Sequence, residues 1–291
     1  MLLLLAFLGG CAGLEGQVNK KAGHILSINR DETLPYERSV SDQIAWGGRF
    51  TEDELAADKL AAYSTKTLKL LMESLNNVSF YTRGAQPHIS RQERVFDELA
   101  RRADVKPDDV GDLFQRYLAA RLFGKAQALK ARFAEVKLWD LPDIIGAKDS
   151  PEQDFWVYDI SSDSKTATAK HLPIETGPKI VVSAWYSCPV AAKAFQSVQD
   201  DWNMLQAMQA HGVILTSRFE PAGVALRNSK IAFARTYVAY TEQDWPGIDF
   251  TQSPTFHFLE NGKVMYRFQG VAAEERFSQE FQLGLSAIGL K

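Results

Sequence analysis

The C-terminal half of the chain contains the segment Lys179-Ile-Val-Val-Ser-Ala-Trp-Tyr-Ser-Cys-Pro189. Its long apolar run predicts a strand that is covered on both faces, because a strand with one solvated face would alternate polar and apolar residues. Cys188 and Pro189 come next, and proline suits the first turn of a helix. An apolar stripe continues from there to His211. The chain is therefore predicted to pass from a buried strand into a helix, with a cysteine at the junction.

The C-terminal half as a whole alternates strands with helices. Strands are predicted at 155–160, 179–185, 212–216, 236–240, 255–259 and 263–268, and helices at 189–211, 222–234 and 274–285. Glu260-Asn-Gly-Lys263 is predicted to be the tight turn between the last two strands, because Asn-Gly readily adopts the backbone that a short hairpin needs. This order predicts an α/β layered domain over residues 151–291.

Three segments of this domain resemble the thioredoxin superfamily. The first is Trp185-Tyr-Ser-Cys-Pro189 after a strand, and the second is Ser253-Pro-Thr255, which looks like the cis-proline segment of the family. The third is the Glu-Asn-Gly-Lys hairpin followed by Phe268-Gln-Gly270. In this order and spacing they most resemble the extracytoplasmic branch of TlpA-like and peroxiredoxin-like proteins.

The resemblance implies a site as well as a fold. Cys188 would be the reactive cysteine, and a cis Pro254 would let the preceding chain lie beside it. An extended substrate segment would pair with that chain in β fashion. The substrate-binding residues implied in this way are Trp185, Pro189 and Ser253.

The expected chemistry of Cys188 follows from its place at the start of a helix. The first backbone N–H groups of a helix have no partner within it, and the helix dipole places a partial positive charge there. Both features favour a thiolate over a thiol, and the thiolate is the nucleophile in disulfide exchange.

Three positions depart from the family pattern. The dithiol motif of the family has a second cysteine where this chain has Ala191. Val182 stands where the family often has an acidic or polar residue, and Trp185 stands where a peroxiredoxin has threonine. These differences argue against peroxidase activity, and the missing second cysteine argues against copper delivery.

Two functions remain open at this point. In the first, the chain is a monothiol thiol-disulfide oxidoreductase, in which Cys188 exchanges disulfides and a thiol from outside resolves the adduct. In the second, the domain is a redox-inactive module that binds or assembles proteins, and Cys188 is a small apolar side chain.

The N-terminus resembles that of bacterial lipoproteins. Met1–Leu8 is an apolar run too short to span a bilayer, which takes about 20 residues, and it fits the core of a signal peptide. Leu8-Gly-Gly-Cys11 is like the lipobox, whose cysteine is acylated after cleavage. No Lys or Arg precedes the run, so an ordinary apolar helix ending at Gly9-Gly10 is the alternative. The resemblance implies lipid, such as palmitate, on Cys11 and a periplasm-facing place in the cell envelope, with Ala12 favouring the outer membrane.

A small all-α helical region is predicted before the α/β domain. Thr51-Glu-Asp-Glu54 and Ser90-Arg-Gln-Glu93 have the spacing of capping boxes, and Pro107 suits a first helical turn. The stretch 117–133 loosely resembles a tetratricopeptide helix pair. Because it has no second copy, a packed helical bundle is favoured over a peptide-binding module. One helix is predicted from an apolar stripe that recurs on a single face, formed by Leu68, Leu71, Met72 and Leu75.

The patterns divide the chain into four parts with a boundary near 142–151, where Pro142, Gly146 and Pro151 fall. The parts are a signal peptide at 1–10, an irregular tether and lead-in at 11–50, a helical region at 51–140, and the thioredoxin-like domain at 151–291.

The composition narrows the classes of partner. The 291 residues carry a formal net charge of −3, which gives no electrostatic basis for binding nucleic acid. The only two cysteines, Cys11 and Cys188, and the five scattered histidines lack the spacing of a zinc site, so neither a metal nor a cofactor is expected. The expected partners are envelope proteins with exchangeable thiols and the membrane, through the lipid anchor.

Overall fold

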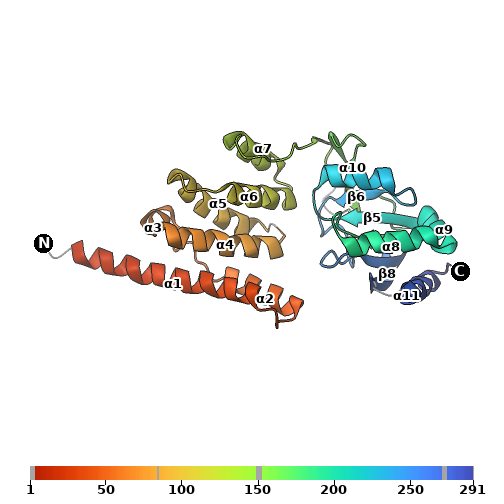
Figure 1. The fold of residues 1–291 in the computed structure, drawn as a ribbon, viewed down its shortest axis with the longest axis horizontal. Helices are drawn as coiled ribbons and strands as arrows, with labels where there is room; N and C mark the ends of the chain where they lie inside the picture. The colour runs from red at the N-terminus through yellow and green to blue at the C-terminus, as the bar shows by residue number, and fades with distance from the viewer. Residues whose placement is uncertain (1–3, 84, 149–152, 271–273, 291) are drawn as a thin grey trace. The chain divides into compact units, whose positions relative to one another are not determined.

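The computed structural model describes residues 4–83, 85–148, 153–270 and 274–290 (Figure 1). The chain divides into two compact units, Met1–Trp139 and Asp140–Lys291. The first unit is helical and the second contains the sheet, as the fold class predicted from the sequence requires.

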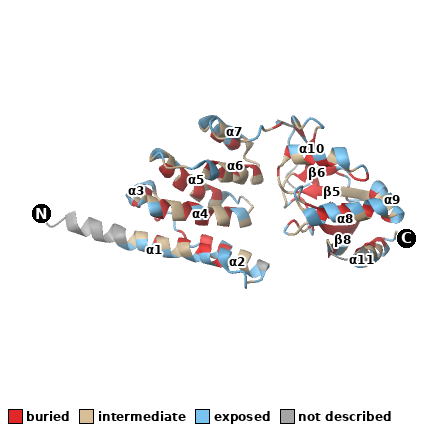
Figure 2. Ribbon diagram, viewed as in Figure 1, coloured by how far each residue is buried: buried red, intermediate tan, exposed pale blue. Residues whose placement is uncertain are grey.

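Helices make up the N-terminal unit. Leu68, Leu71, Met72 and Leu75 of the predicted stripe are all buried on α4, which packs against α1 and α5 (Figure 2). That helix prediction is confirmed. The bounds are α1 Leu4–Arg30, α2 Tyr36–Gly47, α3 Ala57–Ala62, α4 Thr65–Tyr81, α5 Gln86–Arg101, α6 Pro107–Ala119 and α7 Phe123–Arg132.

The segment 12–50 is not the irregular lead-in that its glycines suggested. It forms most of α1 and all of α2. Val18, Ala22 and Ile25 are fully buried where α1 lies along α4 (Figure 1). Helix α1 also runs through Leu8-Gly-Gly-Cys11, so it does not end at Gly9-Gly10. Within the described part of the chain, no helix is long and apolar enough to cross a membrane.

Polar contacts fix α1 to the rest of the helical unit. Glu15 accepts hydrogen bonds from the backbone N–H of Ser64 at 2.9 Å and from the hydroxyl of Thr67 at 2.6 Å, at the start of α4. Lys21 pairs with Glu54 at 2.7 Å, and the Glu54 side chain is only 4% exposed. These contacts make α1 an integral part of the helical bundle.

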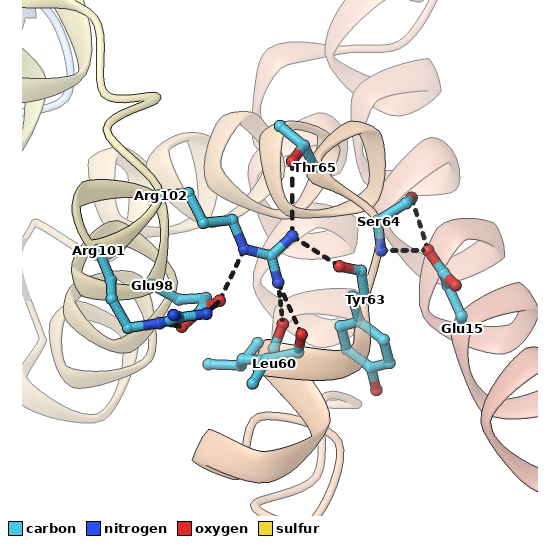
Figure 3. A network of polar contacts seen from close by, with 9 residues as sticks. Glu15, Leu60, Tyr63, Ser64, Thr65, Glu98, Arg101 and Arg102 are labelled. Carbon is cyan, nitrogen blue, oxygen red and sulfur yellow. Dashed lines mark hydrogen bonds and ion pairs between the residues drawn. The ribbon is translucent and has the colours of Figure 1, made fainter.

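A second set of polar contacts holds α3 against α5 (Figure 3). Arg102, just after α5, donates hydrogen bonds to the carbonyl of Leu60 at 3.0 Å and to that of Tyr63 at 2.8 Å. Its Nε also donates to Glu98 at 2.7 Å. The guanidinium thereby adds hydrogen bonds to carbonyls at the C-terminal end of α3, where a helix cannot satisfy all of its own carbonyls.

The two predicted capping boxes have different outcomes. Thr51 and Glu54 exchange both hydrogen bonds, at 2.9 and 3.2 Å, but they close a turn ahead of α3. Ser90 does not cap a helix, because α5 already begins at Gln86 with a proline in its first turn. The prediction that Pro107 opens a helix is confirmed by α6.

The C-terminal unit is built on an eight-stranded sheet in the order β1-β3-β2-β6-β5-β4-β7-β8. Strands β4, β5 and β6 are parallel, whereas β7 is antiparallel to β4 and forms a hairpin with β8. The bounds are β1 Asp143–Ile145, β2 Trp156–Ile160, β3 Thr166–His171, β4 Pro178–Ser183, α8 Pro189–Asp200, α9 Trp202–His211, β5 Gly212–Thr216, α10 Pro221–Lys230, β6 Thr236–Ala239, β7 Thr255–Glu260, β8 Lys263–Gln269 and α11 Glu274–Ala287.

Both faces of β4 are covered, as its continuous apolar sequence predicted. Ile180 and Val182 belong to one core cluster, together with residues of α8, α9 and α11. Val181 points the other way into a second cluster, which includes Trp245. The single helix predicted at 189–211 is instead two helices, because Asp201 accepts hydrogen bonds from the first backbone N–H groups of α9.

Candidate functional site

Cys188 lies at the junction of β4 and α8, where the sequence predicted it. It is the N-cap residue of α8, and Pro189 is in the first turn. The cysteine is free and partly exposed. Because β4 is packed on both faces, it fixes the position at which the following loop begins. The Cys188 thiol lies at the start of α8 and is partly exposed to solvent.

The segment before β7 meets this loop. The Ser253–Pro254 peptide bond is cis, as the resemblance implied. Ser253 makes two contacts with the loop: its carbonyl accepts from the Cys188 Sγ at 3.1 Å, and its hydroxyl accepts from the Trp185 backbone N–H at 2.9 Å. Two segments that are far apart in the sequence thus converge on the thiol.

Gly270 supports Pro254 from the end of β8. Its backbone N–H donates to the Pro254 carbonyl at 2.7 Å. A Cβ at Gly270 would lie 2.5 Å from carbons of the Pro254 ring, closer than side chains approach in proteins. The close packing explains why glycine suits this position of the Phe268-Gln-Gly270 segment.

The structure brings all the predicted residues of the thiol site together. Trp185, Cys188, Pro189, Ser253 and Pro254 lie at one edge of the sheet, where β4 ends and β7 begins. Cys11 lies in the other unit, in a part of α1 whose side chains are outside the described residues.

Arg227 is a residue of the site that the sequence patterns do not reveal. This side chain comes from α10 and is buried, with the residue only 6% exposed. It donates hydrogen bonds to the carbonyls of Ala184 and Trp185, at 3.1 and 2.5 Å. No local signal marks it, because its partners are more than 40 residues away in the sequence.

Two aromatic residues, Trp185 and Tyr186, precede Cys188 in the same loop. The Arg218 guanidinium stacks on the Trp185 ring, 4.2 Å from its centroid. Tyr186 is 37% exposed and lies against α10, where a Cβ at Gly223 would come within 2.9 Å of the ring. Val190 is 45% exposed. An apolar surface with one stacked cation therefore borders the cysteine.

The departures from the family pattern are also visible in the structure. Ala191 is 1% exposed and Val182 is fully buried. Both side chains are apolar, so neither position offers a polar group to Cys188. Among the described residues, the hydrogen bond of the Cys188 side chain is to a carbonyl, not to a carboxylate. Within the part of the site that the structure describes, Cys188 is the thiol nucleophile, and no carboxylate forms a hydrogen bond with it.

His257 on β7 has a structural role. Its Nε2 accepts from the Asp249 backbone N–H at 2.9 Å, and its Nδ1 donates to the Val181 carbonyl at 3.2 Å. Burial lowers the pKa of His257 to about 4, so the ring is neutral at physiological pH. No group of three or more metal-ligating side chains occurs within the residues that the structure describes.

The strand order and the site together define the class of this unit. Three parallel strands continue into an antiparallel hairpin, a cysteine begins the helix after β4, and a cis-proline precedes β7. This arrangement is that of a thioredoxin-like domain.

No protein-family model and no curated protein matches the chain. Among solved structures it is similar to a thioredoxin-like protein from Bacteroides caccae ATCC 43185, with 10% identity and a TM-score of 0.33, over 86% of this chain and 95% of that one. It is also similar to a proposed electron transfer protein from Aquifex aeolicus VF5, with 13% identity and a TM-score of 0.33, over 50% of this chain and 95% of that one. The fold assignment itself rests on the topology and the site described above.

Proposed function

We propose that this chain is a membrane-anchored envelope protein that carries out thiol-disulfide exchange through its single thiol, Cys188. The observation that supports this most directly is the position of the sulfur. It is partly exposed at the start of α8 and lies 3.1 Å from the Ser253 carbonyl. A client strand that pairs beside Ser253 would bring its own sulfur to the thiol.

The exchange begins at Cys188. The Cys188 thiolate attacks one sulfur of a client disulfide, the client S–S bond breaks, and a mixed disulfide with Cys188 forms. The second client sulfur leaves as a thiolate and takes up a proton. Because Ala191 cannot act as a resolving thiol, an external thiolate then attacks the client sulfur of the mixed disulfide, so that Cys188 leaves as a thiolate and the external thiol becomes joined to the client. A second external thiol breaks that bond and releases the reduced client; the two external thiols supply the two electrons and end as a disulfide.

The proposed anchor is an acyl group on Cys11. After cleavage before this cysteine, only Ala12, Gly13 and Leu14 would separate the lipid from Glu15, which already contacts α4. That span, four residue steps from Cys11 to Glu15, reaches at most about 14 Å when extended. The helical unit would therefore sit close to the bilayer surface.

The anchor is tested by labelling cells with a palmitate analogue. The wild-type chain should carry the label and fractionate with membranes, and Cys11→Ala should lose both properties. Cys188→Ser serves as the matched control, because it removes the other thiol and should keep the label. An unlabelled wild-type chain would contradict the proposed anchor.

A redox-inactive protein-binding module is the second candidate function. Two observations favour it: Ala191 is buried in place of a resolving cysteine, and the S–H···O contact to Ser253 requires a protonated sulfur. Timed alkylation with iodoacetamide at neutral pH, followed by intact-mass measurement, separates the two functions. Fast modification of Cys188 in the folded protein supports exchange, and modification only after unfolding supports the binding module.

A further inference from the structure

Arg227 holds the loop that carries Cys188. Its Nη2 donates to the Trp185 carbonyl at 2.5 Å, and the Cys188 backbone N–H donates to the same carbonyl at 3.4 Å. Its Nη1 donates to the Ala184 carbonyl at 3.1 Å. The Arg227 guanidinium thus binds two consecutive carbonyls directly after β4. One of them, the Trp185 carbonyl, also accepts from the Cys188 backbone N–H.

The charge of Arg227 is buried at this place. Loss of hydration on burial lowers the pKa of Arg227 to about 10, so the side chain is still protonated at neutral pH. Its hydrogen bonds are to neutral carbonyls, and the rings of Tyr186 and Phe195 lie 5.7 and 5.6 Å from the guanidinium carbon. Within the described residues, no carboxylate forms an ion pair with it. Its charge therefore remains available to a nearby anion.

The charged and titratable groups around Arg227 are few. Glu220, at the start of α10, interacts with it electrostatically, and Tyr186 and Cys188 do so when they are ionised. A second cation, Arg218, stacks on the ring of Trp185. The Ser253 carbonyl, which is in contact with the sulfur, opposes a negative charge there. A thiolate at this place would be stabilised by the N-terminus of α8 and by the positive charge of Arg227.

We propose that Arg227 is a positioning residue for Cys188, which fixes the thiol loop and stabilises the thiolate with a buried positive charge. The proposal rests on the exchange function described above. The guanidinium is suited to both tasks, because its planar fork binds two carbonyls while it keeps its charge.

The test compares iodoacetamide alkylation of Cys188 in full-length variants between pH 6 and 10. Arg227→Met removes both the fork and the charge, whereas Arg227→Lys keeps the charge. Arg218→Met is the matched control, since it removes the same charge from the ring of Trp185. A cooperative thermal transition by circular dichroism shows that each variant is folded.

Arg227→Met should slow alkylation at pH 7 by roughly tenfold, the factor that one moderate charge interaction gives, and the rate should recover at high pH. Arg227→Lys should regain most of the neutral rate, and Arg218→Met should match the wild type. Glu220→Gln, which removes the negative charge acting on Arg227, should speed alkylation. This variant keeps the test decisive if Arg227→Met does not fold.

Three results would overturn the proposal. One is an Arg227→Met variant that is folded and reacts like the wild type. Another is a rate that falls equally at every pH, which would leave Arg227 with a purely structural role. The third is an unchanged rate in Glu220→Gln when Arg227→Met is unfolded. A wild-type Cys188 that resists alkylation while folded would instead refute the exchange function itself.

Discussion

Replacing Lys21 with methionine should destabilise the helical unit strongly. The Lys21 ammonium lies 2.7 and 2.8 Å from the two Glu54 oxygens, and it also donates to the Arg49 carbonyl at 2.8 Å. The Glu54 side chain is 4% exposed and that of Lys21 is 22% exposed. Removing one partner of a buried ion pair costs about 3–5 kcal/mol, and the partial exposure of Lys21 places this case near 3 kcal/mol.

Urea unfolding followed by far-ultraviolet circular dichroism measures the effect. With a slope of about 2 kcal/mol per molar urea, the midpoint for the helical unit should fall by about 1.5 M. Arg30→Met is the control, because the Arg30–Glu73 pair has side chains 71% and 58% exposed. Such surface pairs contribute about 0–1 kcal/mol. The double variant Lys21→Met with Glu54→Gln should regain part of the loss, since no unpaired buried carboxylate remains.

The result that would refute this reasoning is a Lys21→Met variant with wild-type stability. Residues 12–30 would then behave as the tether that the sequence first suggested, and the packing of α1 on α4 would not stabilise the unit. The proximity of the helical unit to the bilayer would lose its support as well.

Three further predictions concern the C-terminal unit and the anchor. Gly270→Ala should lower the free energy of unfolding by about 1–3 kcal/mol and slow alkylation of Cys188, because the added methyl group would clash with the Pro254 ring. Thermal unfolding measures the first effect and mass spectrometry the second. Unchanged values would contradict the close packing of Gly270 on Pro254. The free energy of unfolding of the C-terminal unit should fall as the pH drops from 6.5 towards 4, because the unfolded chain takes up a proton on His257 that the folded chain does not. Urea unfolding across this range measures the dependence on pH. If the same dependence persists in His257→Gln, another group causes it. The last prediction compares two dye-labelled variants in lipid vesicles, Lys66→Cys and Phe80→Cys, each made in a Cys188→Ser background. The dye at position 66 should transfer energy to headgroup acceptors more efficiently, because Lys66 lies at the end of α4 that contacts Glu15. Equal transfer from the two positions would argue against a short anchor.

The thiol site could be predicted largely from local sequence. The apolar run of β4 is long enough to specify a strand with both faces covered, and the cysteine and proline that follow mark the start of α8. The Ser253-Pro-Thr255 segment was placed by resemblance, and the structure brings it against Cys188. Arg227 could not be found in this way, because its role depends on carbonyls that the fold brings to it.

Other elements were missed for physical reasons that differ from case to case. Strand β3 has the polar sequence Thr-Ala-Thr-Ala-Lys-His, and only Ala167 in it is buried, so it carries little periodic signal. In α1, by contrast, Val18, Ala22 and Ile25 do recur on one helix face. The nearby glycines Gly13, Gly16 and Gly23 obscured that stripe, and the tertiary contacts with α4 outweigh their low helix propensity.

If Cys188 is a reactive single thiol, it should react with an aromatic disulfide in the folded protein. Folded mature protein, with Cys11 acylated, is mixed with 5,5′-dithiobis(2-nitrobenzoate) at neutral pH while the released thiolate is followed by absorbance. The exchange function predicts a rapid release of one equivalent per chain, with the other half of the reagent retained on Cys188, because Ala191 cannot resolve the mixed disulfide. Release that occurs only after the protein is unfolded would contradict the claim, and so would a Cys188→Ser variant that reacts like the wild type.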